Sequence, residues 1–185
     1  MLGISLMFVF YGISYGSIMS FVIILGQRLN ISNSGLYFMI FAIITAAVRP
    51  PTGRYFDMKG PGNVMGAGFL FAVCGMLLLA YASGPLFYFA SAVFMGFGAG
   101  IVMSFLVAMS MNIVAPDRRG ATNATIFTAF DGGIGIGSVA LGWFASAFSI
   151  SVMYICSAAI LIIPLAYYYI YGRGSYNRLY AEMKG

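Results

Sequence analysis

Long apolar runs separated by short polar breaks constrain this chain more than any other feature. Runs close to or above the roughly 20 residues that a helix needs to cross about 30 Å of hydrocarbon recur from one end to the other. Hydrophobic residues make up 62% of the 185 residues and charged residues only 7%, whereas a soluble domain is about 25% charged. A water-soluble globule needs a polar surface, and this composition cannot supply one. We therefore expect a protein whose solvent is the lipid bilayer.

The sequence predicts an all-α, polytopic membrane protein with six transmembrane helices. The expected spans are residues 3–26, 35–56, 64–83, 86–114, 121–148 and 151–171, which form one bundle over residues 1–172. The breaks between them carry turn residues, as in Lys59-Gly-Pro-Gly62 and Ala115-Pro-Asp117. Residues 173–185 are expected to form a short cytoplasmic tail.

Basic residues fall unevenly between the two ends of these spans. With the N-terminus in the cytoplasm, only Arg28 lies outside, and the other eight basic residues lie on the cytoplasmic side. Those eight are Arg49, Arg54, Lys59, Arg118, Arg119, Arg173, Arg178 and Lys184. The asymmetry follows the positive-inside rule and predicts a multi-pass protein of the plasma (inner) membrane with both termini cytoplasmic. The net charge of +5 is then explained by basic residues that set the orientation of the chain in the membrane, and no nucleic-acid partner is expected.

A short pattern, G-x-x-x-G-x-x-M-S-F, occurs from Gly12 to Phe21 and again from Gly96 to Phe105. The first three spans thus echo the last three. An odd number of spans per repeat forces opposite topology, which predicts the 3+3 inverted repeat of transporter folds. Chance is the alternative, because Gly, Ser, Met and Phe are abundant here. Glycines four residues apart are expected to let helices approach closely; they are Gly12, Gly16, Gly96, Gly100, Gly133 and Gly137.

Two charges lie where charge is costly. Asp131 is about 16 Å past Gly120 along a helix, near the middle of the bilayer. A charge there costs at least about 2.5–3.5 kcal/mol and is a functional candidate. Arg49 stands at the end of the apolar part of the second span. Its expected depth in the bilayer differs from that of Asp131 by less than one helical turn. If the second and fifth spans are neighbours, the two side chains can neutralise each other, and a proton or substrate at Asp131 would release Arg49 as a charge switch. The alternatives are a purely structural salt bridge and an arginine that snorkels to the headgroups.

The segment Arg49-Pro-Pro-Thr-Gly53-Arg54-Tyr-Phe-Asp57-Met-Lys59-Gly60 resembles the signature loop of the major facilitator superfamily, in the copy that follows the eighth helix. A second stretch, from Pro116 through Arg118-Arg119-Gly120 to Asp131, is similar to the junction of the tenth and eleventh helices of bacterial efflux-type members. Met58 departs from the family pattern, which commonly has a basic residue there. The resemblance covers essentially the whole chain, as the C-terminal six-helix half of a twelve-helix fold.

This resemblance implies secondary active transport of a small molecule by alternating access, coupled to protons as in an antiporter. It places Gly53, Arg54, Asp57, Lys59 and Gly60 in a signature cytoplasmic loop, and Arg118, Arg119 and Gly120 in a second cytoplasmic loop. It implies that spans one, two, four and five line the cavity. The candidate cavity residues are then Tyr11, Ser14, Tyr15, Ser20, Ser104, Asn123 and Thr128. The expected partners are lipid, substrate, protons and a second six-helix bundle, which is either a missing N-terminal half or another copy of the chain.

Enzyme chemistry finds little support in these residues. The chain has no histidine, so it lacks the commonest metal ligand and the usual base beside a serine or cysteine nucleophile. It also has one deep acid and no thiolate cluster, and we expect no catalytic site, no metal and no cofactor. The alternatives to a transporter half are a membrane scaffold without transport activity and a half-transporter that works as a homodimer.

Overall fold

The computed structural model describes residues 2–59, 64–172 and 174, and the predicted all-α class is confirmed for them. The six long helices are α1 (Leu2–Arg28), α2 (Leu36–Lys59), α3 (Val64–Ala80), α4 (Pro85–Asn112), α5 (Arg119–Ala147) and α6 (Ile150–Tyr167). A 3-10 turn, η1 (Pro116–Arg118), precedes α5, and a π-helical turn, η2 (Tyr168–Gly172), follows α6. Apart from residue 174, the predicted tail over residues 173–185 lies outside the described residues.

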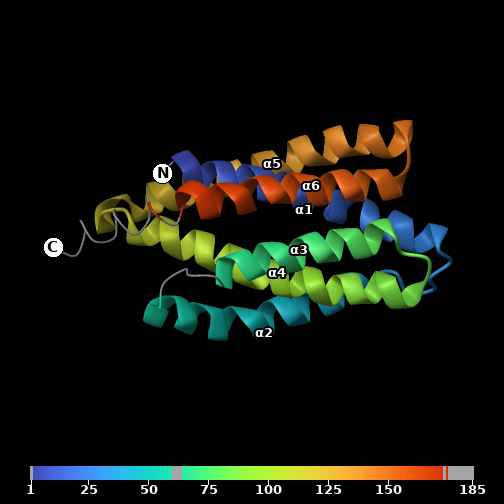
Figure 1. Cartoon of the computed structure of the whole chain (residues 1–185), viewed down its shortest axis with the longest axis horizontal. Coiled ribbons are helices and arrows are strands. Elements are labelled where there is room, and N and C mark those ends of the chain that lie inside the picture. The colour runs from blue at the N-terminus through green and yellow to red at the C-terminus, as the bar shows by residue number, and fades with distance from the viewer. Residues whose placement is uncertain (1, 60–63, 173, 175–185) are drawn as a thin grey trace.

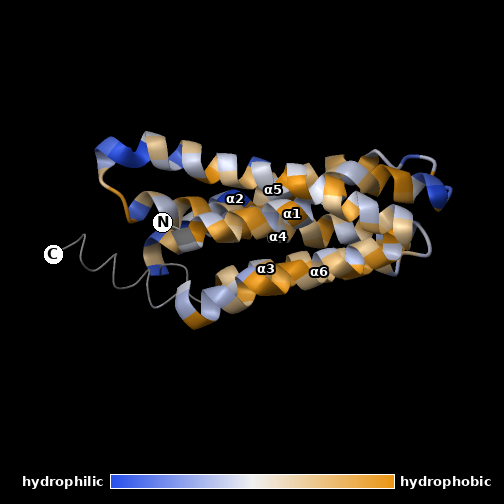
Figure 2. Ribbon diagram, turned by 90° about the horizontal axis from the view of Figure 1, so that it is seen from above, coloured by the Kyte–Doolittle hydropathy of each residue, from blue (hydrophilic) through white to orange (hydrophobic). Residues whose placement is uncertain are grey.

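The helices lie side by side and alternate in direction (Figure 1). The N-terminus, the end of α2 and the start of α5 therefore lie at one end of the bundle, which we call the N-terminal end. The connections α1–α2, α3–α4 and α5–α6 lie at the other, the far end. Hydrophilic residues gather at the two ends, and the long middle parts of the helices are largely apolar (Figure 2). This distribution matches a bundle whose middle is surrounded by lipid.

Five helical segments in the described part of the chain are long and apolar enough to cross a membrane. They are Gly3–Arg28, Leu36–Lys59, Pro85–Asn112, Pro116–Ala147 and Ile150–Gly172. The third predicted span corresponds to α3, which is apolar but has 17 described helical residues. Five of the six predicted spans thus have the expected length. That the third predicted span, residues 64–83, crosses the membrane stays a prediction.

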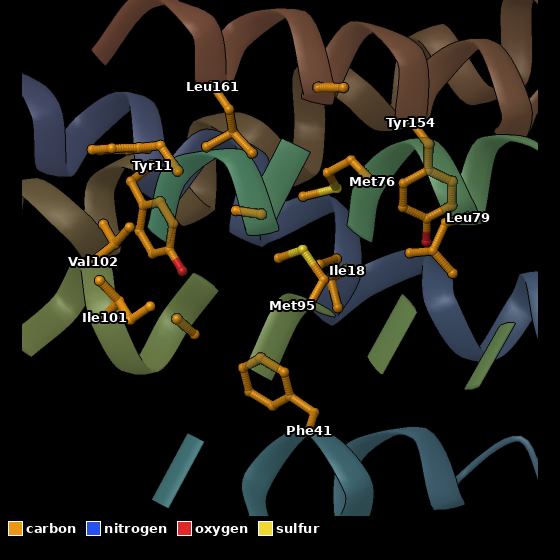
Figure 3. Packing of buried hydrophobic residues seen from close by; sticks show 14 of the residues in the cluster. Tyr11, Ile18, Phe41, Met76, Leu79, Met95, Ile101, Val102, Tyr154 and Leu161 are labelled. Carbon is orange, nitrogen blue, oxygen red and sulfur yellow. The ribbon is translucent and has the colours of Figure 1, made fainter. Parts of the chain in front are cut away.

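The bundle is built from helix pairs. The α1 helix packs mainly on α5 and α6, α2 packs on α4, and α3 joins the two groups by packing on α4 and α6. The core between them holds large apolar side chains: Ile18 of α1, Met76 of α3 and Met95 of α4 lie together, and Phe41 of α2 points toward them (Figure 3). Because α2 and α5 each have few partners, much of both helices is exposed.

The α2 helix runs without a break through Pro50 and Pro51 to Lys59, three residues past the predicted end of this span at residue 56. Proline has a φ compatible with a helix, but it removes the N–H donor to the carbonyl four residues earlier and its ring crowds that carbonyl; both effects are tolerated in membrane helices where neighbouring groups compensate. The hydroxyl of Thr52 donates to the carbonyl of Val48 at 2.6 Å within this stretch.

The signature segment consequently takes a helical form. Gly53, Arg54, Asp57 and Lys59 lie on the last turns of α2, while Gly60 lies outside the described residues. In the second predicted loop, Arg118 ends η1, and Arg119 and Gly120 are already the first residues of α5. The side chains of Arg54, Asp57, Lys59, Arg118 and Arg119 are exposed at the N-terminal end of the bundle.

Candidate functional site

A groove of about 320 Å³ opens between α2, α4 and α5. This volume lies at the lower end of the range for small-molecule sites, about 300–1,000 Å³. Its lining residues are Arg49 from α2, Met103, Ser104, Val107 and Ala108 from α4, and Phe127 from α5. The groove is therefore mostly apolar with one cationic side chain.

The three helices bring these side chains to one level of the bundle. At 1.5 Å per residue, Arg49 lies about 15 Å from the last residue of α2, Lys59. Ser104 lies about 12 Å from the end of α4, and Phe127 about 12 Å from the start of α5. These distances place the groove well inside the length of the bundle and not at its polar end.

The Ser104 hydroxyl is already engaged. It donates to the carbonyl of Gly100 at 2.7 Å on its own helix. Arg49 is thus the strongest hydrogen-bond donor on the groove wall and the only charge among its described lining residues.

Asp131 lies on the same side of α5 as the groove residue Phe127. The two are four residues apart, as are Phe127 and Asn123, so the three follow one face of the helix. All three are exposed, and so is Thr128. Asp131 therefore lies one helical turn beyond the groove, farther from the N-terminal end, on the open face of α5.

The second and fifth spans are not principal packing partners. The α2 helix packs on α4, whereas α5 packs chiefly on α1, and residues of α2 and α5 meet at the groove. The side chains of Arg49 and Asp131 are both exposed, and the described residues show no ion pair between them. The charge switch between these two residues stays a prediction.

Aromatic rings from several helices form a cluster close to Arg49. The half-buried ring of Tyr15 lies 5.5 Å from Phe130, 6.0 Å from Phe41 and 6.2 Å from Tyr11, centroid to centroid. The Tyr11 hydroxyl is buried and has no hydrogen-bond partner among the described residues. Tyr11 is therefore part of the packed cluster beside the groove, and Tyr15 is at its half-exposed edge.

Two other candidate cavity residues take part in helix packing. Ser14 is fully buried and donates to the carbonyl of Ser157 at 3.0 Å, which ties α1 to α6. Ser20 is exposed and donates to the hydroxyl of Ser138 at 3.0 Å, which ties α1 to α5. Neither side chain lines the groove.

The six spaced glycines lie in two helix interfaces that we call the glycine seams. Gly12, Gly16, Gly133 and Gly137 form the α1–α5 seam, where backbone lies against backbone: a Cβ added at Gly16 would be 2.6 Å from the carbonyl oxygen of Ile134. Gly96 and Gly100 form the α2–α4 seam. Added Cβ atoms there would lie 2.7 Å from the Cβ of Ile44 and 2.9 Å from that of Val48.

Sequence reasoning missed four of the six groove residues: Met103, Val107, Ala108 and Phe127. Phe127 could have been found, because it lies one turn from Asp131 on the same helix face. The three α4 residues carried no signal, since α4 is apolar on all sides and no periodicity marks the face it presents.

Comparisons with known proteins agree with this architecture. The sequence model of a family described as Major Facilitator Superfamily matches residues 4–181. The chain is 25% identical over 144 residues to proteins named uncharacterized MFS-type transporter from Burkholderia mallei (strain SAVP1) and Burkholderia pseudomallei (strain K96243). Each match covers 78% of this chain and 35% of the relative. The chain thus spans about a third of the length of the curated relatives it matches.

Proposed function

Because the chain belongs to the major facilitator superfamily, we propose that it serves secondary active transport of a small molecule across the membrane. The family and the relatives' names support membrane transport and a multi-pass membrane protein in general. The observation that carries the proposal for this chain is the groove between α2, α4 and α5, with Arg49 on its wall and Asp131 one turn beyond it. Charges at such depth are expensive and mark substrate or ion pathways.

The packing of the helices supports a 3+3 inverted repeat. If α1, α2 and α3 correspond to α4, α5 and α6, the α1–α5 interface corresponds to the α4–α2 interface, and α3–α4 corresponds to α6–α1. All four interfaces are present. The glycines of the repeated sequence pattern lie in the corresponding seams, Gly12 and Gly16 against α5, and Gly96 and Gly100 against α2. In such a fold the substrate site lies where repeats meet, near the bilayer midplane.

A second six-helix bundle would complete the substrate path. The groove is open, and α2 and α5 have exposed polar or charged side chains at mid-length, Arg49 and Asp131, which lipid alone would not accommodate. The share of the relatives that this chain covers supports a missing N-terminal half, and a second copy of the chain is the alternative. Alternating access would be the rocking of the two bundles around the groove.

Proton coupling is assigned to Asp131, the one acid at this depth. Protonation would remove its charge, and in a closed arrangement of the two bundles its carboxylate would pair with Arg49. Arg54, Lys59, Arg118 and Arg119 lie at the N-terminal end with the start of the chain. We place that end in the cytoplasm, in a plasma (inner) membrane, by the positive-inside rule.

Proteoliposomes holding the full chain and a trapped pH dye test this function. We expect at least one solute from a panel of organic anions, cations and neutral compounds to cause proton movement across the vesicle membrane when the unaltered chain is present. Asp131→Asn should abolish that movement. Asp117→Asn, an exposed acid in η1, is the matched control and should retain it. Gradient-driven transport that survives Asp131→Asn would remove the coupling role. A chain that moves no solute would show that these six helices alone do not transport, which contradicts a half-transporter that works as a homodimer.

A further inference from the structure

We infer that the groove binds an amphipathic organic anion, a carboxylate on an apolar, aromatic-sized body, with Arg49 as the anchor for the carboxylate. This inference rests on the proposed transport function and names the substrate class of the same site. It is carried by the chemistry of the groove wall and by the electrostatic situation of Arg49.

The first step is the unbalanced charge. Arg49 is the only charged residue among the described groove lining, and no described acid forms an ion pair with it. Arg49 lies about 15 Å from the end of its helix, and a guanidinium at such a position in a membrane helix calls for an anionic partner. A planar, permanently charged donor of this kind is best matched by a carboxylate, which it can bind through two parallel hydrogen bonds.

The second step is the apolar remainder of the site. Met103, Val107 and Phe127 supply hydrocarbon, thioether and aromatic surface, and the Ser104 hydroxyl is used on its own helix. Few groups are available to hydrogen-bond a polyhydroxylated body such as a sugar. An apolar ring fits this wall, and the flexible Met103 side chain can adapt to its outline.

The third step is the absence of a competing anion. The described groove lining holds no carboxylate, and the described residues show no ion pair at Arg49. The guanidinium is therefore open to an anion that enters the groove.

Binding measurements on the full chain in nanodiscs of phosphatidylcholine test this inference. The probes are 2-naphthoate, its neutral analogue 2-naphthamide and the cation 2-naphthylmethylammonium, with empty nanodiscs to subtract partition into lipid. We expect naphthoate to bind at least about tenfold more tightly than either analogue. Equal affinity for the three, tighter binding of the cation, or no binding of naphthoate would overturn the assignment.

Variants distinguish the contribution of Arg49 to binding from that of the apolar groove residues. Arg49→Gln should weaken naphthoate binding at least about tenfold and change naphthamide binding less than about threefold, whereas Arg28→Gln at the far end should change neither. Phe127→Ala should weaken both ligands alike. The ratio of the two affinities within one variant does not depend on the folded fraction, and Arg49→Lys offers a second, charge-conserving variant. A ratio unchanged by Arg49→Gln contradicts the inference.

Two more measurements separate a bound solute from a bound lipid, and binding from coupling. If phosphatidylglycerol in the nanodisc lowers naphthoate affinity about tenfold, the anion at Arg49 is a lipid headgroup and the inference fails. Asp131→Asn should leave naphthoate binding intact, because binding does not need coupling. Binding that persists while all transport is absent would therefore refute the proposed function alone, and transport of other solutes without naphthoate binding would refute this inference alone.

Discussion

At the scale of single residues, buried tyrosines differ in whether their hydroxyls are satisfied. The Tyr88 hydroxyl donates to the carbonyls of Val22 at 3.0 Å and Ser34 at 3.1 Å, and so joins α4 to α1 and to the start of α2. The Tyr154 hydroxyl is buried without a hydrogen-bond partner among the described residues and ends beside Leu79 (Figure 3). A buried polar group without a partner costs about 1–3 kcal/mol.

The same change at these two tyrosines should therefore have opposite effects. We expect Tyr88→Phe to lower the free energy of unfolding by about 0.5–1.5 kcal/mol, because the hydrogen bonds of its hydroxyl are lost while both carbonyls keep their backbone donors. Tyr154→Phe should leave stability unchanged or raise it. Thermal unfolding of the purified chain in detergent measures both, and an equal loss in the two variants would show that the Tyr154 hydroxyl has a stabilising role.

The sequence singles out a residue whose type is rare and gives no direction to one whose type is common. Arg49 and Asp131 stand out because charges are rare in apolar helices, and the structure places one on the groove and the other a turn away. The direction of Ser14 could not be predicted because α1 has no polar face: serine, tyrosine and glycine occur all round it. Only packing against α6 decides which way that hydroxyl points.

At the scale of helices, the α1–α5 seam depends on the absence of particular side chains. A Cβ added at Gly133 would meet the carbonyl oxygen of Val9, whereas one added at the adjacent Gly132 meets nothing within 4 Å. Close approach of this kind lets backbones make the van der Waals contacts that hold membrane helices together.

Two neighbouring alanine substitutions test the seam. Gly133→Ala should destabilise the bundle by about 1–3 kcal/mol, because the helices must separate to admit the methyl group. Gly132→Ala should be neutral or slightly stabilising, since alanine favours the helix over glycine. The readout is the unfolding midpoint in detergent, and similar midpoints for the two variants would contradict backbone contact at Gly133.

Helix boundaries in the structure lie close to the predicted ones, including the end of α2, which is Lys59 where the sequence predicts residue 56. Turn residues between Ala80 and Pro85 mark the boundary between α3 and α4. Pro50 and Pro51 locally disfavour a helix, but α2 continues through them and buries Thr52 and Phe56, whose ring packs on that of Phe105 of α4 at 5.1 Å, centroid to centroid. Tertiary contacts of this kind are invisible in a local pattern.

At the scale of the whole molecule, the alternating helices determine which connections share a side of the membrane. The turn at Asn33 lies at the far end, and η1 with Asp117 lies at the N-terminal end. Both residues are exposed. The positive-inside rule places Asp117 in the cytoplasm and Asn33 outside.

Single cysteines at these positions report the orientation. In a chain with Cys74→Ala and Cys156→Ala, we expect a membrane-impermeant maleimide to label Asn33→Cys in intact cells and Asp117→Cys only after permeabilisation. The reverse pattern would invert the proposed topology, and labelling of both in intact cells would contradict a six-span bundle.

The α1–α5 seam also has a consequence for how the protein is made. Gly12 and Gly16 have their partners between Phe130 and Ser138, more than a hundred residues later in the chain. At about 5–20 residues per second, a ribosome needs roughly 6–25 s to reach those partners. During that interval the first helix is held in the bilayer with its glycine face uncovered. Quality-control proteases and insertion chaperones would have their best access to the nascent chain then, so variants in this seam should lower the amount of protein in cells more than their effect on the finished bundle suggests.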